Sequence, residues 1–331
     1  MNARNKSGAS STTSTGITSL VKTGRPIENP DARYEKTGKL FLSNPSALGA
    51  HNWHPMSYNP GTGLVYIPAL QIGGAYIPSP EAHNAPLGFN TGTAMAAADL
   101  PDDVNMVKMV QAATIGQLVA FDPKTGKPAW TIDQPAPWNG GTMTTAGNLL
   151  FQGDAMGKFN VYAADTGKLI TSIDVQSGVL SGASTYKVDG EQYVAFLTSK
   201  GGAWPLVSGY AAESSAAVPN IPRLIVLKLG GTATLPALPP SEPYVWKPLD
   251  QVGTPEDIAA GQAHFQRNCL VCHGPGAVGN GVTPDLRKSG VVADADTWKS
   301  VVIDGLLKGN GMVSFASVLT PQQAEQVRAY V

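Results

Sequence analysis

The chain has 331 residues, about twice the length of a typical domain, which predicts two units and enough sequence for a sizeable core. Lysine and arginine number 23 against 24 aspartates and glutamates, and only 14% of residues are charged, which excludes the basic surface that nucleic-acid binding requires. The 37 glycines and 26 prolines favour a turn-rich β protein.

The N-terminal segment predicts neither an export signal nor a folded element. Residues 1–6 are not followed by the apolar run of roughly 7 to 15 residues that a signal peptide needs. Ser, Thr or Gly occupies eleven of the thirteen positions in 7–19, so we expect a disordered lead-in over residues 1–21. No run of about 18 apolar residues predicts a transmembrane helix.

From residue 22 to 230 the pattern predicts strands. Short apolar runs bounded by turn residues occur at 64–67, 149–151, 193–197 and 224–227. The stretch Gly116–Lys127 recurs as Gly157–Lys168, with each glycine displaced by 41 residues. A period near 40 in a strand-rich chain indicates propeller blades, and the alternative is a pair of similar β-hairpin turns. In either case the Thr-Gly-Lys elements predict turns in which glycine has positive φ.

A domain boundary is expected near residue 250, and beyond it the periodicity of the apolar residues becomes helical. Residues 231–250 carry five prolines and predict an extended linker. Thr254 and Pro255 are typical of a helix start. A second helical run opens at Asp296, with Trp298, Val301, Val302 and Leu306 expected on one face, and a capping box at Thr320–Gln323 predicts a last helix.

The two cysteines of the chain lie in one motif, Cys269-Leu270-Val271-Cys272-His273, just after the first of these helices. A CxxCH motif attaches haem through two thioethers and binds its iron through the histidine, so Cys269, Cys272 and His273 predict a small all-α cytochrome c domain. The alternative is a zinc half-site, which His264 and His273 alone do not complete. Covalent haem attachment normally takes place outside the cytoplasm, which predicts a periplasmic protein.

The sixth iron ligand is expected to be Met312, the only methionine beyond residue 250. It stands in a glycine-rich stretch before the last helix, whereas the rival His264 precedes Cys269 by five residues on the proximal side. The alternative for an isolated methionine is core packing. Met/His ligation raises the reduction potential and leaves no open coordination position, so the haem is expected to carry electrons.

In the β-rich part, the stretch His51–Pro60 and the segment Trp138–Thr142 are dense in polar and aromatic residues. Asn52 and Trp53 together offer an amide and an indole donor to a polar cofactor. The alternative is a turn packed against the blade core, and the pattern alone leaves both interpretations open.

Together these motifs resemble the pyrroloquinoline quinone (PQQ) dependent quinohaemoprotein alcohol dehydrogenases, an eight-bladed propeller followed by a cytochrome c domain. The matching stretches are Thr23–Ile27, Asn29–Tyr34, His51–Pro60, Trp138–Gly153, Val188–Val194, the proline-rich linker, the CxxCH and Gly311–Phe315. The resemblance implies a multidomain chain with an all-β partial propeller of about four blades at 22–230, a linker at 231–250 and a cytochrome c domain at 251–331.

The resemblance also implies site residues. Asn52 and Trp53 match the pair that contacts PQQ, His273 and Met312 match the iron ligands, and Trp204, Trp138 and Asn139 match the quinone pocket less securely. The implied reaction is oxidation of a small alcohol to an aldehyde at PQQ, with electrons passing through covalent haem c to an external acceptor such as a soluble copper protein, a cytochrome or a quinone.

Other family features have no matching positions here. These are the catalytic Asp, the Ca²⁺-binding Glu, Asn and Asp, a vicinal Cys-Cys ring and a PQQ-contacting Lys, all in the first half of the family propeller. In addition, Thr171 stands where the first repeat has Trp130. We therefore expect the C-terminal part of such an enzyme, without alcohol oxidation of its own. The alternatives are a cytochrome electron carrier whose β part docks a partner, and a non-functional gene fragment.

Overall fold

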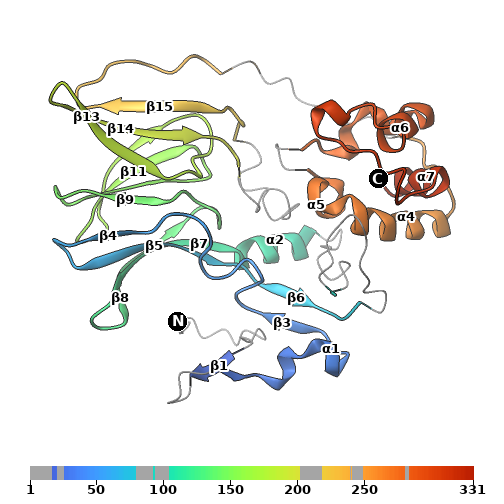
Figure 1. Ribbon diagram of the computed structural model, residues 1–331, viewed down its shortest axis with the longest axis horizontal. Coiled ribbons are helices and arrows are strands. Elements are labelled where there is room, and N and C mark those ends of the chain that lie inside the picture. Colours follow the sequence, from blue (N-terminus) through green and yellow to red (C-terminus); the bar gives the residue numbers. More distant parts are fainter. Residues whose placement is uncertain are drawn as a thin grey trace.

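The computed structural model describes residues 17–20, 26–79, 92–93, 104–201, 218–238, 240, 249–279 and 283–331. The strand-rich part comes first, and a cluster of helices follows it (Figure 1). None of the helices in these ranges is long and apolar enough to cross a membrane.

Three antiparallel sheets make up most of the strand-rich part. The first sheet has strand order β4-β5-β7-β8, the middle sheet β12-β11-β10-β9 and the last sheet β13-β14-β15. Their strands are β4 (Ser57–Asn59), β5 (Leu64–Gln71), β7 (Ile115–Asp122), β8 (Lys127–Gln134), β9 (Thr142–Thr144), β10 (Leu149–Gly153), β11 (Lys158–Ala163), β12 (Leu169–Asp174), β13 (Ala183–Val188), β14 (Glu191–Thr198) and β15 (Arg223–Lys228).

The sheets stack face on face, with the middle sheet between the other two (Figure 1). Tyr66 and Leu118 of the first sheet pack against Leu150 of the middle sheet in one buried cluster. Phe159 of the middle sheet packs against Phe196 of the last sheet in another, with their rings stacked 3.8 Å apart. This arrangement of short antiparallel sheets is an unclosed propeller.

The two sequence repeats form the outer hairpins of neighbouring sheets, β7–β8 and β11–β12. The predicted turn glycines, Gly126 and Gly167, have φ of 68° and 72°. Trp130 Nε1 donates to the carbonyl oxygen of Ala164 over 3.3 Å, and a Cβ on Gly167 would lie 2.8 Å from the Trp130 ring. Trp130 thus ties the first sheet to the middle one, whereas the corresponding Thr171 is exposed.

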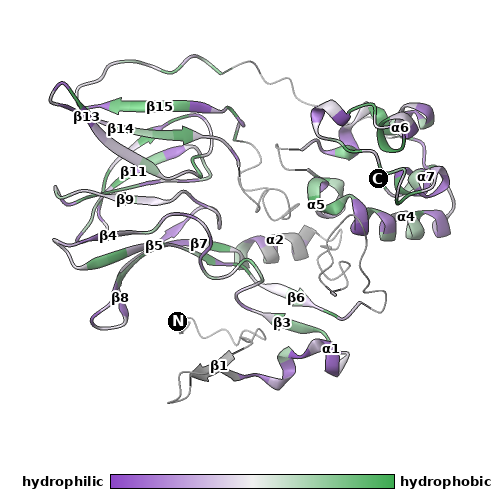
Figure 2. Ribbon diagram, in the orientation of Figure 1, coloured by the Kyte–Doolittle hydropathy of each residue, from purple (hydrophilic) through white to green (hydrophobic). Residues whose placement is uncertain are grey.

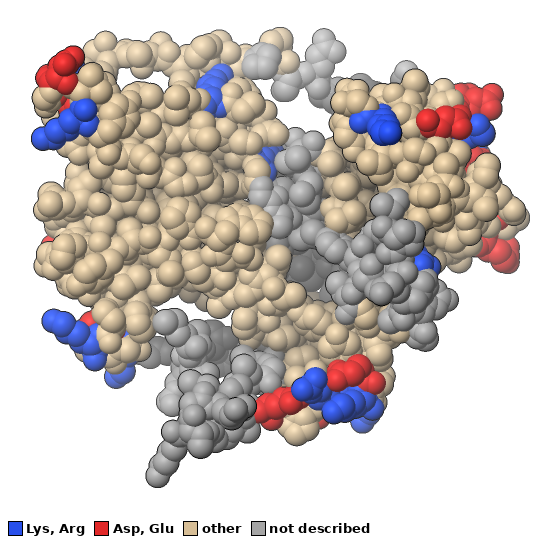
Figure 3. Space-filling view, viewed as in Figure 1, with Lys and Arg blue, Asp and Glu red and all other residues tan. Residues whose placement is uncertain are grey.

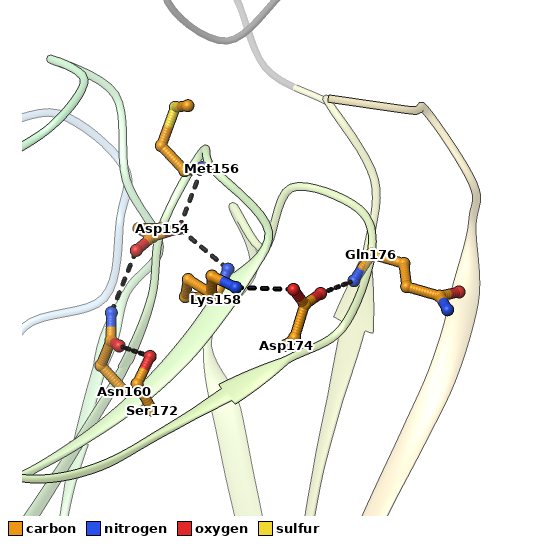
Figure 4. Close-up of polar contacts among 7 residues, drawn as sticks. All are labelled: Asp154, Met156, Lys158, Asn160, Ser172, Asp174 and Gln176. Atoms are coloured by element: carbon orange, nitrogen blue, oxygen red, sulfur yellow. Dashed lines mark hydrogen bonds and ion pairs between the residues drawn. The ribbon is translucent and has the colours of Figure 1, made fainter. Parts of the chain in front are cut away.

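A buried carboxylate organises the turn between β10 and β11 (Figure 4). Asp154 accepts hydrogen bonds from the backbone N–H groups of Met156 and Lys158, and from Asn160 Nδ2 over 3.0 Å. Burial raises the pKa of Asp154. At the exposed rim, Lys158 Nζ donates a hydrogen bond to the carboxylate of Asp174 on β12 over 2.6 Å. The network therefore joins the β10–β11 turn, β11 and β12 of the middle sheet.

The cytochrome-like part has a buried apolar core formed by four helices and the loops between them. The helices are α4 (Pro255–Asn268), α5 (Leu270–His273), α6 (Ala295–Val302) and α7 (Pro321–Tyr330). The predicted caps are confirmed, since Thr254 and Thr320 each form a capping box. Trp298 Nε1 donates to the Ala324 carbonyl oxygen over 2.7 Å, which fixes α6 against α7.

The structure corrects several sequence expectations. The second helix begins at Ala295 with Asp294 as its cap and ends at Val302, so Leu306 is outside it and exposed. Part of the expected disordered lead-in forms β1 (Ile17–Leu20), which pairs with β2 (Pro26–Glu28). Backbone pairing there prevails over a composition poor in apolar groups.

The remaining elements interrupt or flank the three sheets. The helix α2 (Val104–Ala113) interrupts a region expected to be all β. The others are α1 (Tyr34–Thr37), β3 (Phe41–Ser43) and β6 (Gly74–Tyr76), and the two strands form a separate sheet.

The crossing of α4 and α7 requires glycine at position 261. A Cβ there would lie 1.8 Å from the carbonyl oxygen of Gln326. Gly261→Ala gains about 1 kcal/mol of helix propensity, but overpacking of a backbone contact costs about 3 kcal/mol. We expect a net destabilisation of about 2 kcal/mol, measured by urea unfolding followed by far-UV circular dichroism.

The matched control is Gly290→Ala, because a Cβ at Gly290 meets no atom within 4 Å. Its stability should stay within about 0.5 kcal/mol of the parent. Equal stabilities of the two variants would contradict the close approach of α4 and α7.

Candidate functional site

The CxxCH motif lies on a one-turn helix that directly continues the chain from α4. The backbone N–H groups of Cys272 and His273 both donate to the Cys269 carbonyl oxygen, over 3.1 and 2.9 Å. Residues at i, i+3 and i+4 share one face of a helical turn, so this geometry turns both thiols and the imidazole to the same side. Cys269 is buried, Cys272 is exposed, and neither forms a disulfide.

A returning loop packs behind this turn. His273 Nδ1 lies 3.3 Å from the Pro284 carbonyl oxygen, and Thr283 Oγ1 donates to the Cys272 carbonyl oxygen over 2.6 Å. Gly279 has φ of 63°, and a Cβ there would lie 2.6 Å from the Thr283 carbonyl oxygen, so only glycine permits this approach. The loop thereby fixes the plane of the His273 ring.

The tautomer and the charge of the His273 imidazole suit a metal ligand. A proton on Nδ1 donated to Pro284 leaves the Nε2 lone pair free, which is the tautomer that binds a metal. Burial lowers the pKa of His273 and so favours the neutral ring. Burial, together with the neighbouring Cys272, raises the pKa of Cys269 to about 12. The donor set of two thiols and one neutral imidazole on a single face fits covalent haem.

Met312 lies in the loop between α6 and α7, half-buried against the helical core. Gly311 before it has φ of 95°, and the Phe315 N–H donates to the Val302 carbonyl oxygen over 2.8 Å. The hydrogen bond of Phe315 ties the segment after Met312 to the end of α6. The rival His264 lies within α4 and is half-buried, and burial lowers its pKa.

In the strand-rich part, Asn52 and Trp53 lie before β4. The Asn52 amide is anchored locally, because its Nδ2 donates to the Leu48 carbonyl oxygen and its Oδ1 accepts from the Trp53 N–H, both over 2.9 Å. One amide hydrogen and one lone pair remain. The Trp53 side chain is 59% exposed. The exposed indole of Trp53, beside the hydrogen-bonded amide of Asn52, is suited to form one wall of a binding site for a flat polar molecule.

Three buried polar atoms behind Trp53 have no hydrogen-bond partner within the described residues. They are both ring nitrogens of His54 and Nε1 of Trp138, and both side chains are 1% exposed. The His54 ring meets Trp138 edge-on, with centroids 4.7 Å apart, and Trp138 meets Trp53 in the same way at 5.3 Å. Unsatisfied buried groups are costly, and they concentrate where structure serves a function.

Of the other residues expected in the quinone pocket, the structure describes Asn139 but not Trp204. Asn139 is buried, its Nδ2 donates to the Ala136 carbonyl oxygen over 2.7 Å, and its Oδ1 accepts from the Ala155 N–H. Its amide therefore joins segments of the strand-rich part. Trp204 lies outside the described residues. Sequence reasoning missed His54, although it stands in the same motif as Asn52 and Trp53.

The fold and the CxxCH site together define a class: a partial propeller followed by a cytochrome c domain. A family model described as cytochrome c oxidase, cbb3-type, subunit III matches residues 256–331. Quinohemoprotein alcohol dehydrogenase ADH IIB of Pseudomonas putida is 40% identical over 94% of this chain and 44% of its own length. A 1-butanol dehydrogenase (cytochrome c) of Thauera butanivorans is 33% identical over 95% of the chain.

The solved structure of quinohemoprotein alcohol dehydrogenase ADHIIG from Pseudomonas putida matches with a TM-score of 0.87 and 38% identity, over 96% of this chain and 46% of that one. The chain is homologous to part of the quinohaemoprotein alcohol dehydrogenases. It spans less than half the length of these relatives.

The buried His54 makes a testable contribution to stability. Burial, with a smaller effect of His51, lowers the pKa of His54 from about 6.5 to about 4. A lowered folded-state pKa contributes stability above pH 6.5 that is lost as the pH falls through 4, by about 3 kcal/mol. The difference in unfolding free energy between the parent and His54→Phe should therefore shrink by about 2 to 3 kcal/mol between pH 7 and pH 4. Urea unfolding followed by tryptophan fluorescence measures it.

His51→Gln is the control, since His51 is half-buried and its Nδ1 already lies 2.8 Å from the Pro68 carbonyl oxygen. That variant should keep most of the pH dependence. An unchanged difference for His54→Phe across this range would mean that His54 is charged or solvated in the folded protein.

Proposed function

We propose that this chain is the C-terminal part of a PQQ- and haem-dependent alcohol dehydrogenase, the part that passes electrons to an external acceptor. The observation that carries the proposal is the CxxCH turn, on which His273 is held by Pro284 with its Nε2 free. Bound haem supplies one-electron redox chemistry. Cys269 and Cys272 would attach the haem covalently, and His273 and Met312 would bind its iron.

For the quinone, Trp53 offers an exposed indole and Asn52 its remaining amide hydrogen, as one wall of a PQQ site. Trp138 lies behind Trp53 and supports it. No residue of this chain is assigned as the base that takes the alcohol proton or as a Ca²⁺ ligand. Within the described ranges, no group of three His, Cys, Asp or Glu side chains is arranged to hold a metal ion.

The names of the relatives point to alcohols as substrates, with 1-butanol for one of them. We extend that substrate class to the complete enzyme of which this chain is a part. An external acceptor, such as a copper protein, a cytochrome or a quinone, would receive the electrons. Covalent haem attachment normally takes place outside the cytoplasm, which supports a periplasmic location for the complete enzyme.

Met312→Ala tests the iron ligation. Loss of the thioether sulfur should abolish the low-spin Met/His spectrum while the haem remains bound to the denatured chain, because both thioethers are intact. Absorption spectra of the reduced and oxidised protein and haem staining of a denaturing gel give the two measurements. His264→Ala should leave the spectrum unchanged, and the opposite pattern would assign the sixth position to His264.

PQQ titration tests the second cofactor. Added PQQ should quench the tryptophan fluorescence of the haem-loaded chain, and Trp53→Ala should weaken binding about 5- to 150-fold, because stacking on an indole is worth about 1–3 kcal/mol. Trp246 belongs to the proline-rich segment 231–250 of the sequence, so Trp246→Ala tests for nonspecific quenching.

The chain reconstituted with PQQ and Ca²⁺ should not reduce a dye in the presence of 1-butanol. Dye reduction under these conditions would contradict the proposal that the catalytic base lies outside this chain.

In the PQQ titration, equal affinities of Trp53→Ala and the parent would remove Trp53 from the proposed PQQ site.

A further inference from the structure

Three Asn-Gly pairs occur in the chain, at 139–140, 280–281 and 310–311. In such a pair the backbone nitrogen of the glycine can attack the side-chain amide of the asparagine, because glycine has no side chain to hinder the approach and its backbone rotates freely. The second pair lies outside the described residues. The fold holds the first and the third pair in opposite ways.

The pair Asn139-Gly140 is enclosed in the strand-rich part. Asn139 is 4% exposed, its Nδ2 donates to the Ala136 carbonyl oxygen, and its Oδ1 accepts from the Ala155 N–H. The Gly140 N–H donates to the Gly153 carbonyl oxygen over 2.9 Å. Both groups that would have to react with each other are therefore occupied by hydrogen bonds and buried.

The pair Asn310-Gly311 lies at the surface of the helical part. Asn310 ends a one-turn 3-10 helix, Lys308–Asn310, which contributes no residue to the buried core. Figure 2 shows both hydrophilic and hydrophobic segments in the helices around that core. Asn310 is exposed, and its side-chain amide forms no hydrogen bond with the described residues. The amide is therefore free to react.

The backbone around Asn310 is held loosely. The Gly311 N–H donates to the Lys308 carbonyl oxygen over 3.2 Å, and the Met312 N–H donates to the Leu307 carbonyl oxygen over 3.3 Å. Both distances are at or beyond the long end of the range for such hydrogen bonds. A Cβ on Gly311 would meet no atom within 4 Å, so the peptide between Asn310 and Gly311 has room to rotate. An exposed and weakly bonded turn of this kind opens at a low free-energy cost.

We propose that Asn310 is a site of spontaneous deamidation in the folded protein. Rotation about the Cα–C bond of Asn310 brings the Gly311 nitrogen to the Asn310 Cγ. A bond forms between these two atoms, the Cγ–Nδ2 bond breaks, and the Nδ2 group leaves as ammonia with the proton of the Gly311 nitrogen. The product of this step is a succinimide ring, which water then opens at one of its two carbonyl carbons.

The carbonyl carbon that water attacks decides the product. Opening of the ring at Cγ restores the normal backbone and leaves an aspartate. Opening at the main-chain carbonyl carbon leaves an isoaspartate, in which the backbone runs through the former side chain and is one methylene group longer. In both cases the net reaction consumes one water and releases one ammonia, so it needs no oxidant, reductant or further reactant.

The aspartate product adds only an exposed charge. Figure 3 shows the charged side chains of the visible face in small separate groups, with wide uncharged areas between them. One more exposed carboxylate, two residues from Lys308, changes the local electrostatics little. Aspartate at position 310 is therefore expected to leave haem ligation unchanged.

The isoaspartate product changes the loop that carries Met312. The extra methylene group lies two residues before Met312, and the segment after Met312 is tied by the hydrogen bond from the Phe315 N–H to the Val302 carbonyl oxygen. A longer backbone between α6 and this tie displaces the Met312 side chain. This consequence rests on the proposed role of Met312 as an iron ligand, whereas the deamidation itself does not.

The experiment ages the full, haem-loaded chain at mildly alkaline pH and, for comparison, at mildly acidic pH. Peptide mapping by mass spectrometry measures the conversion of Asn310 and of Asn139, and enzymatic methylation of isoaspartate distinguishes the two products. Conversion of Asn310 should be at least about tenfold faster, because the buried pair must first lose three hydrogen bonds. It should also be faster at the alkaline pH, since the glycine nitrogen attacks after loss of its proton.

Two matched variants separate the charge from the longer backbone. Asn310→Gln should abolish conversion at this position, because its amide carbon lies one bond farther from the Gly311 nitrogen. Asn310→Asp, used without ageing, carries the charge on a normal backbone. The low-spin spectrum should be lost in proportion to isoaspartate in the aged parent, and it should be kept by aged Asn310→Gln and by fresh Asn310→Asp.

Absence of conversion at position 310, or equal rates at Asn310 and Asn139, would overturn the proposed site. An unchanged spectrum in protein rich in isoaspartate would overturn the effect on the Met312 loop. The mass and methylation measurements do not depend on haem ligation, and Met312→Ala tests ligation separately. Failure of this proposal is therefore distinguishable from failure of the proposed function.

Discussion

The strand-rich part depends on the burial of sheet faces between successive sheets. Each short sheet is too small to be stable alone, and it gains stability only from the apolar surface that a neighbour removes from water. Tyr66, Leu150, Phe159 and Phe196 mark these buried contacts from the first sheet to the last. The last sheet has apolar residues on both faces, and it buries Phe196 against the middle sheet while Leu197 and Leu224 are exposed.

Local hydrogen bonds position the side chains that this stacking brings together. The carboxylate of Asp154 holds the β10–β11 turn, and Trp130 reaches across to Ala164. The polar atoms left without partners within the described residues are on His54 and Trp138. They lie directly behind the exposed Trp53, which forms one wall of the proposed PQQ site.

The helical part is organised differently, around one turn of helix. The spacing of Cys269, Cys272 and His273 places them on one face, and Gly279 lets the 283–284 segment approach closely enough to fix the imidazole. Gly261 lets α7 cross α4 at the same time. Two glycines thus determine how tightly the CxxCH turn is enclosed.

The features that rest on local spacing could be predicted from the amino-acid sequence. These include the strand runs, the turn glycines Gly126 and Gly167, the capping boxes at Thr254 and Thr320, and the CxxCH, because each depends on neighbours within a few residues. The sequence also predicted the partial propeller, through the 41-residue repeat and the resemblance.

Features that depend on distant segments became visible only in the folded chain. There the Pro284 carbonyl oxygen lies beside His273, Leu306 lies outside α6, and His54 packs against Trp138, a residue 84 positions away. The tertiary structure also distinguished the two faces of the last sheet, because Phe196 and Ile225 are buried whereas Leu197 and Leu224 are exposed. Apolar residues occur on both faces, so the pattern of residues does not tell which face is buried, and burial follows from packing.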